Sequence, residues 1–394
     1  IFLNNLKIPA PNWGTAFSID EALLVAHDVG YPVLVRPSYV LGGRGMEIVY
    51  DDEGLKTYVG KAALVSGDHP ILIDAFIEDA FEFDVDALCD GKEVFVAGII
   101  QHIEEAGIHS GDSSCVLPAY ELTSESRKII KKYTTELALN LNTIGLINIQ
   151  FAIKNDEVFV IEVNPRASRT VPFISKVIDF PLAKVAAQLA VGKVLSDFLL
   201  PKSSNNGLIA IKKPVFPFNK FPKQNVFLSP EMKSTGEVIG FDKNLGSAYA
   251  KAEEGAGNLL PEKGTVFISV NTSDKVKTIP LARDFQELGF KIMATSGTAK
   301  LLIENGIITQ TIFKVGEGRP NIVDAIKNDE VQMVINTPLG AQSRFDEYEI
   351  GRSAIRYKIP AITTIAGAQA AVRGIRNKKT NQINYYSLQE IFGS

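Results

Sequence analysis

The chain has 394 residues, an apolar fraction of 45% and a formal net charge of -4. This length exceeds that of one ordinary domain, so two or three domains are expected. The balanced charge lacks the basic character of nucleic-acid-binding proteins, and no apolar run of about 18 residues could span a membrane.

The first half of the sequence alternates helical and extended patterns. A capping-box sequence at residues 18–21 predicts a helix of about ten residues that ends at Gly30. Strict alternation of apolar and polar residues over 81–87 predicts a half-buried strand. The other strands predicted in this half are 33–35, 46–50, 71–73 and 94–100, and the other helices are 52–65, 124–141 and 182–191.

A glycine-rich loop at residues 36–45, Arg36 to Gly45, lies between two of these strands. Glycines let backbone N–H groups approach a phosphate closely, and Arg36 and Arg44 add fixed positive charge. The loop lacks the Gly-Lys-Ser/Thr sequence that opens a helix in a Walker-type loop. It is therefore a candidate phosphate-binding loop or, alternatively, a tight hairpin whose glycines serve the turn alone.

Two further polar residues are candidates for nucleotide binding. Glu82 could accept hydrogen bonds from ribose hydroxyls, although an ordinary polar strand position is the simpler interpretation. His109 lies in a loop of small residues, 104–114, and such loops on rigid scaffolds often carry function. It could donate to a triphosphate, or it is a solvated imidazole on the surface. The remaining histidines are interpreted as structural or surface residues: His27, His69 and His102.

The strand pattern at residues 158–166 contains the strongest candidate site. Residues two apart on a strand share a face, so Glu162 and Asn164 point the same way. Gln150 reaches that face if the strands on either side of 154–157 pair as a hairpin. One carboxylate and two amide oxygens suit magnesium, which prefers one or two carboxylates beside substrate phosphates. The alternative is an ordinary half-exposed hairpin with alternating apolar and polar residues.

Arg166 and Arg169 directly follow this strand. Two guanidinium groups beside a metal and a glycine-rich loop suit stabilisation of a phosphoryl group during transfer. Surface charge on a loop is the alternative, but the flanking Pro165 and residues 170–173 favour the first interpretation. No Ser–His–Asp or Cys–His arrangement competes, so these elements together predict phosphoryl transfer.

The second half begins with two predicted breaks, at residues 202–207 and 253–257, around a Pro-rich segment at 214–230 with little regular structure. Strands then alternate with helices, which predicts a parallel sheet covered on both faces. The predicted strands are 266–270, 291–294, 331–336 and 361–364.

A second ligand site is predicted at the carboxyl edge of this sheet. Thr295 and Thr298 lie in a small turn that opens a helix, where exposed N–H groups and the helix dipole favour an anion. Asn336 ends another strand at the edge where open α/β sheets bind ligands. A plain helix cap at either threonine is the alternative, and the absence of an evident general base favours binding over catalysis. Candidate charge partners are Lys275, Lys314 and Arg319.

Cys89 and Cys115 are the only cysteines, and their spacing fits no metal motif. This argues against a disulfide scaffold and fits a reducing cytosol, so a cytoplasmic location is expected. The N-terminal residues lack the pattern of a secretory signal. The sequence begins at Ile1 without an initiator Met, and we expect it to be a fragment of something longer.

These motifs together resemble the C-terminal part of the large subunit of carbamoyl phosphate synthase over nearly the whole chain. The signatures are the sequences at 35–44, 107–113, 161–167, 169–173, 217–222 and 230–237. The resemblance implies an α/β and α+β multidomain protein, in which an ATP-grasp domain precedes a Rossmann-like parallel-sheet regulatory domain related to methylglyoxal synthase. The implied domains are an N-terminally truncated ATP-grasp domain at 1–200, a Pro-rich extension and linker at 201–258, and the allosteric domain at 259–394.

By this resemblance, the module phosphorylates carbamate with ATP to give carbamoyl phosphate. The implied ATP contacts are Arg36, Ile77, Glu82, Gly107, Ile108, His109, Ser110, Gln150 and Glu162. The implied ligands of Mg²⁺ or Mn²⁺ are Gln150, Glu162 and Asn164, and the implied catalytic residues are Arg166, Arg169 and Asn164. The implied contacts of a nucleotide effector, UMP or IMP, are Lys275, Thr295, Thr298, Lys314 and Asn336.

The implied partners are the N-terminal half of the large subunit, a glutamine amidotransferase small subunit and the effector, with no nucleic acid or membrane. Ala75 replaces a nucleotide-contacting His of some members, and Pro338 replaces a hydroxyl residue of the effector site. An alternative is a chain that is inactive alone and binds only nucleotide effectors. Another is a different grasp ligase, such as a biotin carboxylase, against which the 107–113 loop argues. Pyrimidine and arginine synthesis both remain open as pathways.

Overall fold

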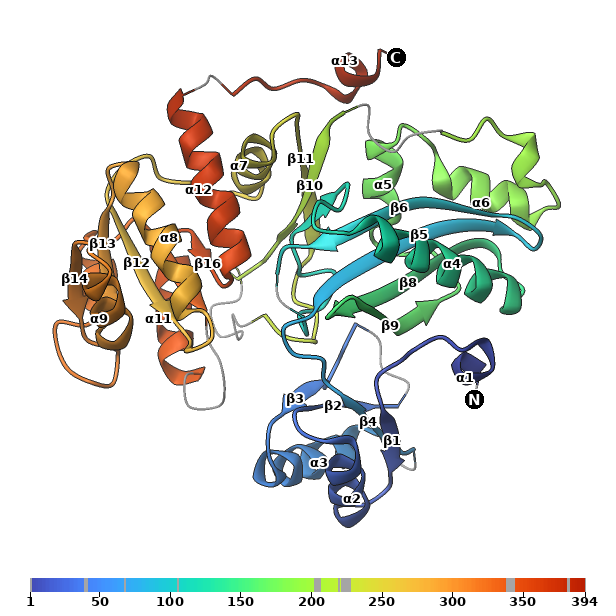
Figure 1. Ribbon diagram of the computed structural model, residues 1–394, viewed down its shortest axis with the longest axis horizontal. Helices are drawn as coiled ribbons and strands as arrows, with labels where there is room; N and C mark the ends of the chain where they lie inside the picture. Colours follow the sequence, from blue (N-terminus) through green and yellow to red (C-terminus); the bar gives the residue numbers. More distant parts are fainter. Residues whose placement is uncertain are drawn as a thin grey trace. The chain divides into compact units, whose positions relative to one another are not determined.

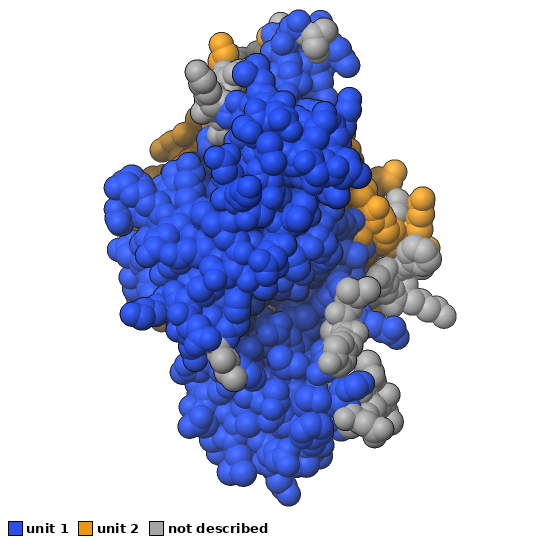
Figure 2. Space-filling view, turned by 90° about the vertical axis from the view of Figure 1, so that its right-hand side faces the viewer, with its two compact units in different colours: residues 1–207, 228–233, 386–394 blue, residues 208–227, 234–385 orange. Residues whose placement is uncertain are grey.

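The computed structural model describes residues 2–38, 42–66, 69–104, 106–201, 207–218, 220, 228–337, 344–380 and 383–393. Residues 39–41 of the glycine-rich loop, most of the predicted break at 202–207, and Pro338 lie outside these ranges. The chain forms two compact units, which Figure 2 colours separately. The first comprises 1–207, 228–233 and 386–394, and the second comprises 208–227 and 234–385.

The first unit begins with a four-stranded sheet in the order β1-β4-β2-β3, on which helices α2 (Ile19–Val29) and α3 (Asp52–Ser66) pack (Figure 1). The Ser18 side chain accepts the N–H of Glu21, and Gly30 ends α2 as predicted. The Glu21 carboxylate accepts the N–H of Phe17 instead of completing the predicted box. The remaining elements are α1 (Phe2–Leu6), β1 (Trp13–Ala16), β2 (Val33–Pro37), β3 (Glu47–Val49) and β4 (Ile71–Ala75).

A second sheet of the first unit carries the strands that hold the candidate site. Within this unit its strands follow the order β7-β6-β5-β8-β9, and the neighbours are antiparallel. Helix α4 (Ser124–Asn140) covers one face, and α5 (Val171–Val177) and α6 (Leu182–Ala190) lie on the other (Figure 1). The other elements are β5 (Phe81–Asp90), β6 (Val94–His102), β7 (Cys115–Leu117), β8 (Ile144–Lys154), β9 (Glu157–Asn164), a 3₁₀ turn at Leu195–Asp197 and α13 (Leu388–Phe392).

The prediction of a half-buried strand at 81–87 is wrong, because β5 is buried on both faces from residue 83 to residue 89. Phe83 and Val85 belong to the core under α4. Asp84 and Asp86, which the pattern places on a solvent face, are 1% and 0% exposed. Buried carboxylates are tolerated only with hydrogen-bond or ionic partners, so this polar face is enclosed by other polar groups.

The second unit opens with an antiparallel pair, β10 (Ile209–Val215) and β11 (Gly236–Asp242), against which helix α7 (Leu245–Gly255) packs. The predicted break at 253–257 is wrong, because α7 continues to Gly255. Glu253 is 3% exposed and lies 2.8 Å from the Lys213 ammonium, which stabilises the end of the helix. The stretch 201–258, predicted as an extension and linker, therefore contains three regular elements.

The rest of the second unit is a five-stranded sheet in the order β14-β13-β12-β15-β16. All its neighbouring strands are parallel, as predicted. Val266, Phe267 and Ile268 of β12 are successively buried at 0% exposure, which confirms that helices cover both faces. The strands are β12 (Thr265–Val270), β13 (Lys291–Thr295), β14 (Thr309–Ile312), β15 (Met333–Thr337) and β16 (Ala361–Ile362). The helices are α8 (Lys275–Glu287), α9 (Ser296–Glu304), α10 (Ile322–Lys327), α11 (Arg344–Arg356) and α12 (Ile365–Thr380).

Candidate functional site

Strands β8 and β9 bring the three predicted metal ligands onto one face. Gln150 pairs directly with Glu162, and Asn148 pairs with Asn164. Residues that pair across antiparallel strands point to the same side of the sheet. The two strands are joined by a turn at 155–156, where both residues have positive φ. The predicted hairpin is therefore confirmed, and it places one carboxylate and two amides side by side.

These three side chains differ in their access to solvent. Glu162 is exposed, whereas Gln150 and Asn164 are half-buried. Among the residues that the structure describes, no three His, Cys, Asp or Glu side chains form a metal-binding group. The donors here are instead one accessible carboxylate and two amide oxygens, which fits a hard cation that is bound together with phosphates.

The polar face continues from β8 onto β5. Asp84 pairs with Gln150, and Asp86 pairs with Asn148. Two rows of polar residues therefore cross three strands: Asp84, Gln150 and Glu162 in one row, and Asp86, Asn148 and Asn164 in the other. Each row runs from a buried carboxylate toward the β9 edge, where Glu162 is exposed.

Glu82, a predicted nucleotide contact, is held by two protein groups. Its Oε1 accepts the N–H of Gly107 at 3.0 Å, and its Oε2 lies 3.2 Å from Nδ1 of His102. His102 Nε2 lies 3.0 Å from the Asp84 carboxylate. Burial alone would lower the pKa of His102, but its contacts with Cys115, Asp84 and Glu82 raise that pKa well above its usual value. His102 is thus a cation between two carboxylates.

The sequence interpretation of His102 as an ordinary structural or surface residue missed this contact. The side chain is 5% exposed, so it is not a surface residue. The available signal was a histidine at the end of an apolar strand, with Glu82 and Asp84 two residues apart on another strand. Only the pairing of β5 with β6 brings these groups together.

The loop after β6 fixes the orientation of His109. The N–H of Gly111 donates to His109 Nδ1 at 3.0 Å, so Nε2 carries the ring proton and is available as a donor. Burial lowers the pKa of His109, and Arg169 lowers it further against the opposing charges of Asp112 and Glu162. The half-buried imidazole is therefore neutral at pH 7. Ile108 and Ser110 of the same loop are also half-buried.

Two other predicted nucleotide contacts, Arg36 and Ile77, lie on or beside the four-stranded sheet of the first unit. Arg36, on β2, forms an ion pair with Asp74 of β4, with 2.8 Å between Nε and Oδ2, and keeps 30% of its side chain exposed. Ile77 is half-buried in the connection between β4 and β5. Its neighbour Phe76 packs its ring against Gly107.

Arg166 and Arg169 are exposed on the loop between β9 and α5. Arg166 Nη1 donates to the carbonyl of Ala167 at 2.9 Å, within the loop itself. Arg169 Nη1 lies 2.6 Å from the Met232 sulfur and beside Gly111, where an added Cβ would lie 2.7 Å from it. Arg169 therefore lies next to the loop that carries His109.

Residues 228–233 also belong to this site, although the stretch 230–237 was predicted only as a signature of the family resemblance and not as a contact of the site. The N–H of Met232 donates to the Gly42 carbonyl at 3.0 Å, and the N–H of His109 donates to the Ser229 carbonyl at 2.9 Å. The segment thereby joins the glycine-rich loop to the His109 loop. A short backbone segment without strand or helix periodicity offers no signal of this kind.

Gly42 and Gly43 of the glycine-rich loop pack against that segment. Gly43 has a φ of +66°, and a Cβ built there would lie 1.8 Å from the Pro230 carbonyl oxygen. Only glycine fits this position, because both the dihedral angle and the close approach exclude a side chain. The requirement for Gly43 is thus one of backbone packing, and phosphate binding by this loop stays a prediction.

The predicted effector contacts of the second unit lie at the carboxyl edge of its parallel sheet. The hydroxyls of Ser269 and Thr295 are 3.2 Å apart, and Ser269 pairs with Asn336 on β15. The N–H of Val270 donates weakly to Thr298 Oγ1, at 3.5 Å. Four strand and helix ends therefore present hydroxyl and amide groups at one edge.

The lysines at this edge differ in position. Lys275 Nζ approaches the start of α9, 3.4 Å from where a Cβ on Gly297 would lie. Thr295 is the N-cap residue of α9, but its side chain does not cap the helix. The helix-cap alternative therefore does not explain the Thr295 hydroxyl. Lys314 follows β14, and its side chain is exposed.

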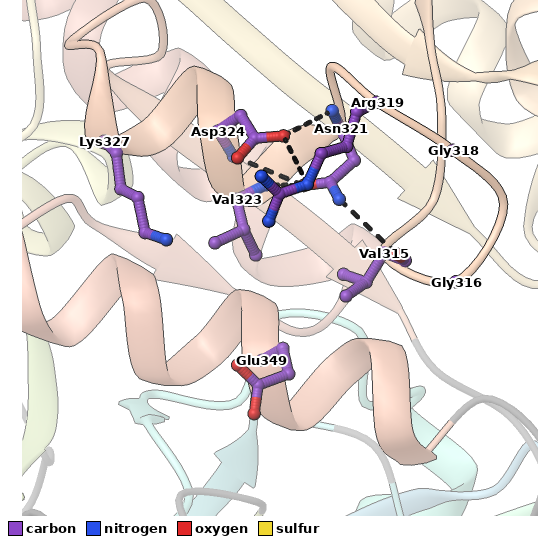
Figure 3. Close-up of a pocket in the computed structure, with 9 residues that line it drawn as sticks. All are labelled: Val315, Gly316, Gly318, Arg319, Asn321, Val323, Asp324, Lys327 and Glu349. Carbon is purple, nitrogen blue, oxygen red and sulfur yellow. Dashed lines mark hydrogen bonds and ion pairs between the residues drawn. The ribbon is translucent and has the colours of Figure 1, made fainter.

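A pocket of about 450 Å³ begins one residue after Lys314 (Figure 3). Arg319, a predicted charge partner, lies there with its Nε 3.8 Å from the Asp324 carboxylate. Lys327 and Glu349 add one charge of each sign. The pocket therefore contains both positive and negative side chains, and the exposed Arg319 guanidinium forms an ion pair with Asp324 inside it.

Two family models match this chain. The model described as carbamoyl-phosphate synthase L chain, ATP binding domain, matches residues 3–198, and the MGS-like domain matches residues 277–363.

Part of the fold also matches solved structures. A biotin carboxylase–β,γ-ATP complex from Campylobacter jejuni has a TM-score of 0.51 and 16% identity over 63% of this chain and 62% of that one. Rhizobium etli pyruvate carboxylase with acetyl coenzyme A has a TM-score of 0.52 and 17% identity over 65% of this chain and 26% of that one. These two likenesses show the fold alone.

Curated relatives match at much higher identity. The carbamoyl phosphate synthase large chain of Acidobacterium capsulatum is 55% identical and that of Archaeoglobus fulgidus 54%, each over 98% of this chain. The chain spans 36% of the length of both. The C-terminal section of the Aquifex aeolicus large chain is 48% identical over 98% of this chain and 76% of that protein. Within the ranges that the structure describes, no helix has the length and apolar character to cross a membrane. The chain belongs to the carbamoyl phosphate synthase large chain family of ATP-grasp ligases and matches its C-terminal section.

Proposed function

We propose that this chain phosphorylates carbamate with ATP to give carbamoyl phosphate, as part of a glutamine-hydrolysing carbamoyl phosphate synthase. The observation that carries the proposal is the pairing of Gln150 with Glu162, with Asn164 two residues further on and two arginines in the next loop. Phosphoryl transfer needs positioning and charge neutralisation more than a protein nucleophile. The family and its ATP-binding domain support this choice of reaction.

In this proposal the loops around His109 hold the nucleotide. The proposed contacts are Arg36, Ile77, Glu82, Gly107, Ile108, His109, Ser110, Gln150 and Glu162. The neutral His109 ring carries its proton on Nε2, because Gly111 donates to Nδ1. It can therefore donate one hydrogen bond to a phosphate oxygen. His102 and the Gly107 N–H hold the Glu82 carboxylate in one orientation, in which it would accept hydrogen bonds from ribose hydroxyls.

Gln150, Glu162 and Asn164 would hold Mg²⁺ or Mn²⁺, whose charge, when bound, neutralises the phosphate oxygens. A carbamate oxygen attacks the γ-phosphorus, the bond from this phosphorus to the β–γ bridging oxygen breaks, and ADP leaves. Arg166, Arg169 and Asn164 are the proposed catalytic residues. The guanidinium groups would donate to the oxygens of the phosphoryl group in transfer, where charge is spread over those oxygens.

The second unit would bind a nucleotide effector of the UMP or IMP type. The proposed contacts are Lys275, Thr295, Thr298, Lys314 and Asn336. Hydroxyl and amide groups at a carboxyl sheet edge, beside the uncapped start of α9, suit an anionic ligand. The proposed protein partners are the N-terminal half of the large chain and a glutamine amidotransferase small subunit, in a cytoplasmic enzyme.

The reverse reaction tests the proposed activity. This chain, combined with the N-terminal section of the large chain, should form ATP from ADP and carbamoyl phosphate. Glu162→Gln should lower the rate about 100-fold or more, as expected when a strong transition-state contact is lost. Glu157→Gln, an exposed glutamate on the same strand, is the matched control and should keep the rate. Equal activity of both variants would remove the role of Glu162.

A second candidate function is nucleotide binding without turnover. It is favoured by the hydroxyl and amide groups at the carboxyl edge of the second unit's sheet, which suit a bound anion and include no evident general base. Thermal-shift titrations separate the two candidates, since a ligand stabilises only the state that binds it. Stabilisation by UMP alone favours the binding function, whereas stabilisation by ATP with magnesium favours the catalytic one.

A further inference from the structure

A fully buried carboxylate lies beneath the loop that carries the two arginines. Asp86 of β5 is 0% exposed. Its Oδ1 accepts the Ser168 hydroxyl at 2.6 Å and the Asn148 amide at 3.2 Å, and its Oδ2 accepts the Thr170 hydroxyl. Every donor therefore comes from β8 or from the loop that follows β9.

These contacts bracket Arg169 in the sequence. Ser168 precedes it and Thr170 follows it, and their hydroxyls are 2.8 Å apart. The N–H of Thr170 also donates to the Ser168 hydroxyl at 3.2 Å. The backbone on both sides of Arg169 is thus tied to one carboxylate in the sheet, while the Arg169 side chain remains exposed.

The same carboxylate also reaches the row that contains Asn164. Asn148, which donates to Asp86, pairs with Asn164 across β8 and β9. A carboxylate without solvent is costly unless it is hydrogen-bonded, and removal of its donors would leave an uncompensated buried charge. Asp86 and its donors therefore form one unit in which each member depends on the others.

We infer that Asp86 is a positioning residue that, through Ser168 and Thr170, sets the place of Arg169 in the loop that it shares with Arg166. This inference rests on the proposed function, in which those arginines face the phosphoryl group. A displacement of about 1 Å in a reacting geometry can cost about 100-fold in rate. Nucleotide binding would be less affected, because its proposed contacts lie mainly on the loops around residues 36, 77 and 107–110.

Kinetics of the reverse reaction test the inference in this chain combined with the N-terminal section. Asp86→Asn and Thr170→Val should each lower kcat about 10- to 100-fold and leave the KM for ADP within about threefold. Thr170→Ser, which keeps the hydroxyl, should restore most of the rate. The double variant should lose little more than either single one, since residues of one network are not additive.

The matched control is Thr134→Val in α4. Thr134 is also 0% exposed, and its hydroxyl donates to the Ile130 carbonyl at 2.8 Å, so the substitution removes a buried hydroxyl far from the arginines in sequence. It should lower stability without lowering kcat. Equal kcat values for Thr170→Val and Thr134→Val would overturn the inference.

A readout without turnover separates this inference from the proposed function. Trypsin cleaves after arginine, and local opening of a loop exposes it to proteolysis. Native-state cleavage after Arg166 and Arg169 should be about 10-fold faster in Asp86→Asn and Thr170→Val than in Thr134→Val, as expected for the loss of hydrogen bonds to a charged group. Unchanged cleavage overturns the inference even if the enzyme is active. An inactive wild-type enzyme with accelerated cleavage in both variants overturns only the proposed reaction.

Discussion

His102 and Glu82 are in contact across β6 and β5, with 3.2 Å between Nδ1 and Oε2. The other Glu82 oxygen accepts the N–H of Gly107 at 3.0 Å. The carboxylate proposed to bind ribose is therefore fixed by two groups of the protein itself. His102→Asn should raise the KM for ADP about 10-fold and change kcat less, because a charged contact to Glu82 is lost.

Steady-state kinetics of ATP formation, together with calorimetric titration of ADP, measure this effect. His27→Asn is the control, since His27 also contacts a carboxylate, Asp52 at 2.8 Å, but on the surface. It should leave both constants unchanged. If the two variants bind ADP equally well, Glu82 needs no support from His102.

Asp86 should also make stability depend on pH. Burial raises its pKa to about 6, although hydrogen bonds from Ser168 and Thr170 oppose the rise. The folded protein then takes up a proton more readily than the unfolded chain, so this contribution to stability is fully present below about pH 4 and is lost as the pH rises through 6. The free energy of unfolding of wild type minus that of Asp86→Asn should fall by about 2 kcal/mol between pH 4 and pH 7. Urea unfolding at several pH values measures it, and a constant difference would show that Asp86 titrates normally.

Gly43→Ala should destabilise the first unit more than an ordinary glycine substitution. The new Cβ would meet the Pro230 carbonyl in a backbone with φ of +66°. Gly42 has nearly the same φ, +64°, and the atoms nearest to an added Cβ there, those of Met232, lie at an ordinary 3.9 Å. Gly42→Ala should therefore cost about 1 kcal/mol for the dihedral angle alone, and Gly43→Ala about 3 kcal/mol or more. The free energy of unfolding in urea tests this, and equal costs would mean that residue 230 moves aside freely.

Lys314→Ala should weaken binding of the nucleotide effector about 10-fold while leaving uninhibited turnover nearly unchanged. The reason is that its exposed ammonium follows β14 at the carboxyl edge of the sheet. Lys300→Ala is the control, because Lys300 is an exposed lysine of α9 that lies near Glu304. Thermal-shift titration with UMP and with IMP measures binding. A loss of affinity equal to that of Lys300→Ala would show that Lys314 lies outside the effector site.

Local pattern was sufficient to predict the hairpin of the candidate site. Asn155 and Asp156 form the turn, and a period of two places Glu162 and Asn164 on one face. Both signals lie within about 20 residues of sequence, so the register of β8 with β9 follows from the chain itself. The parallel sheet of the second unit was equally predictable, because strands and helices simply alternate.

The burial of β5 could not be predicted in the same way. Alternation of apolar and polar residues indicates that one face of a strand is polar. It does not show whether that face contacts water or the polar side chains of other elements. Asp86 accepts hydrogen bonds from Ser168 and Thr170, which lie more than 80 residues later in the sequence, and Asp84 contacts His102 on another strand. For the same reason the acidic end of α7 looked like a break, although Glu253 pairs with Lys213, 40 residues earlier.

The first unit is assembled from separate stretches of the sequence, and this has a consequence for its synthesis. Its strands β1 to β9 are encoded before residue 207, yet the segment that joins the Gly42 and His109 loops is residues 228–233. During translation, both loops are therefore synthesised before residues 228–233, which hold them together through backbone hydrogen bonds. The nascent site remains open until residues 228–233 have emerged, and a premature stop before residue 228 would leave both loops without the backbone hydrogen bonds that join them.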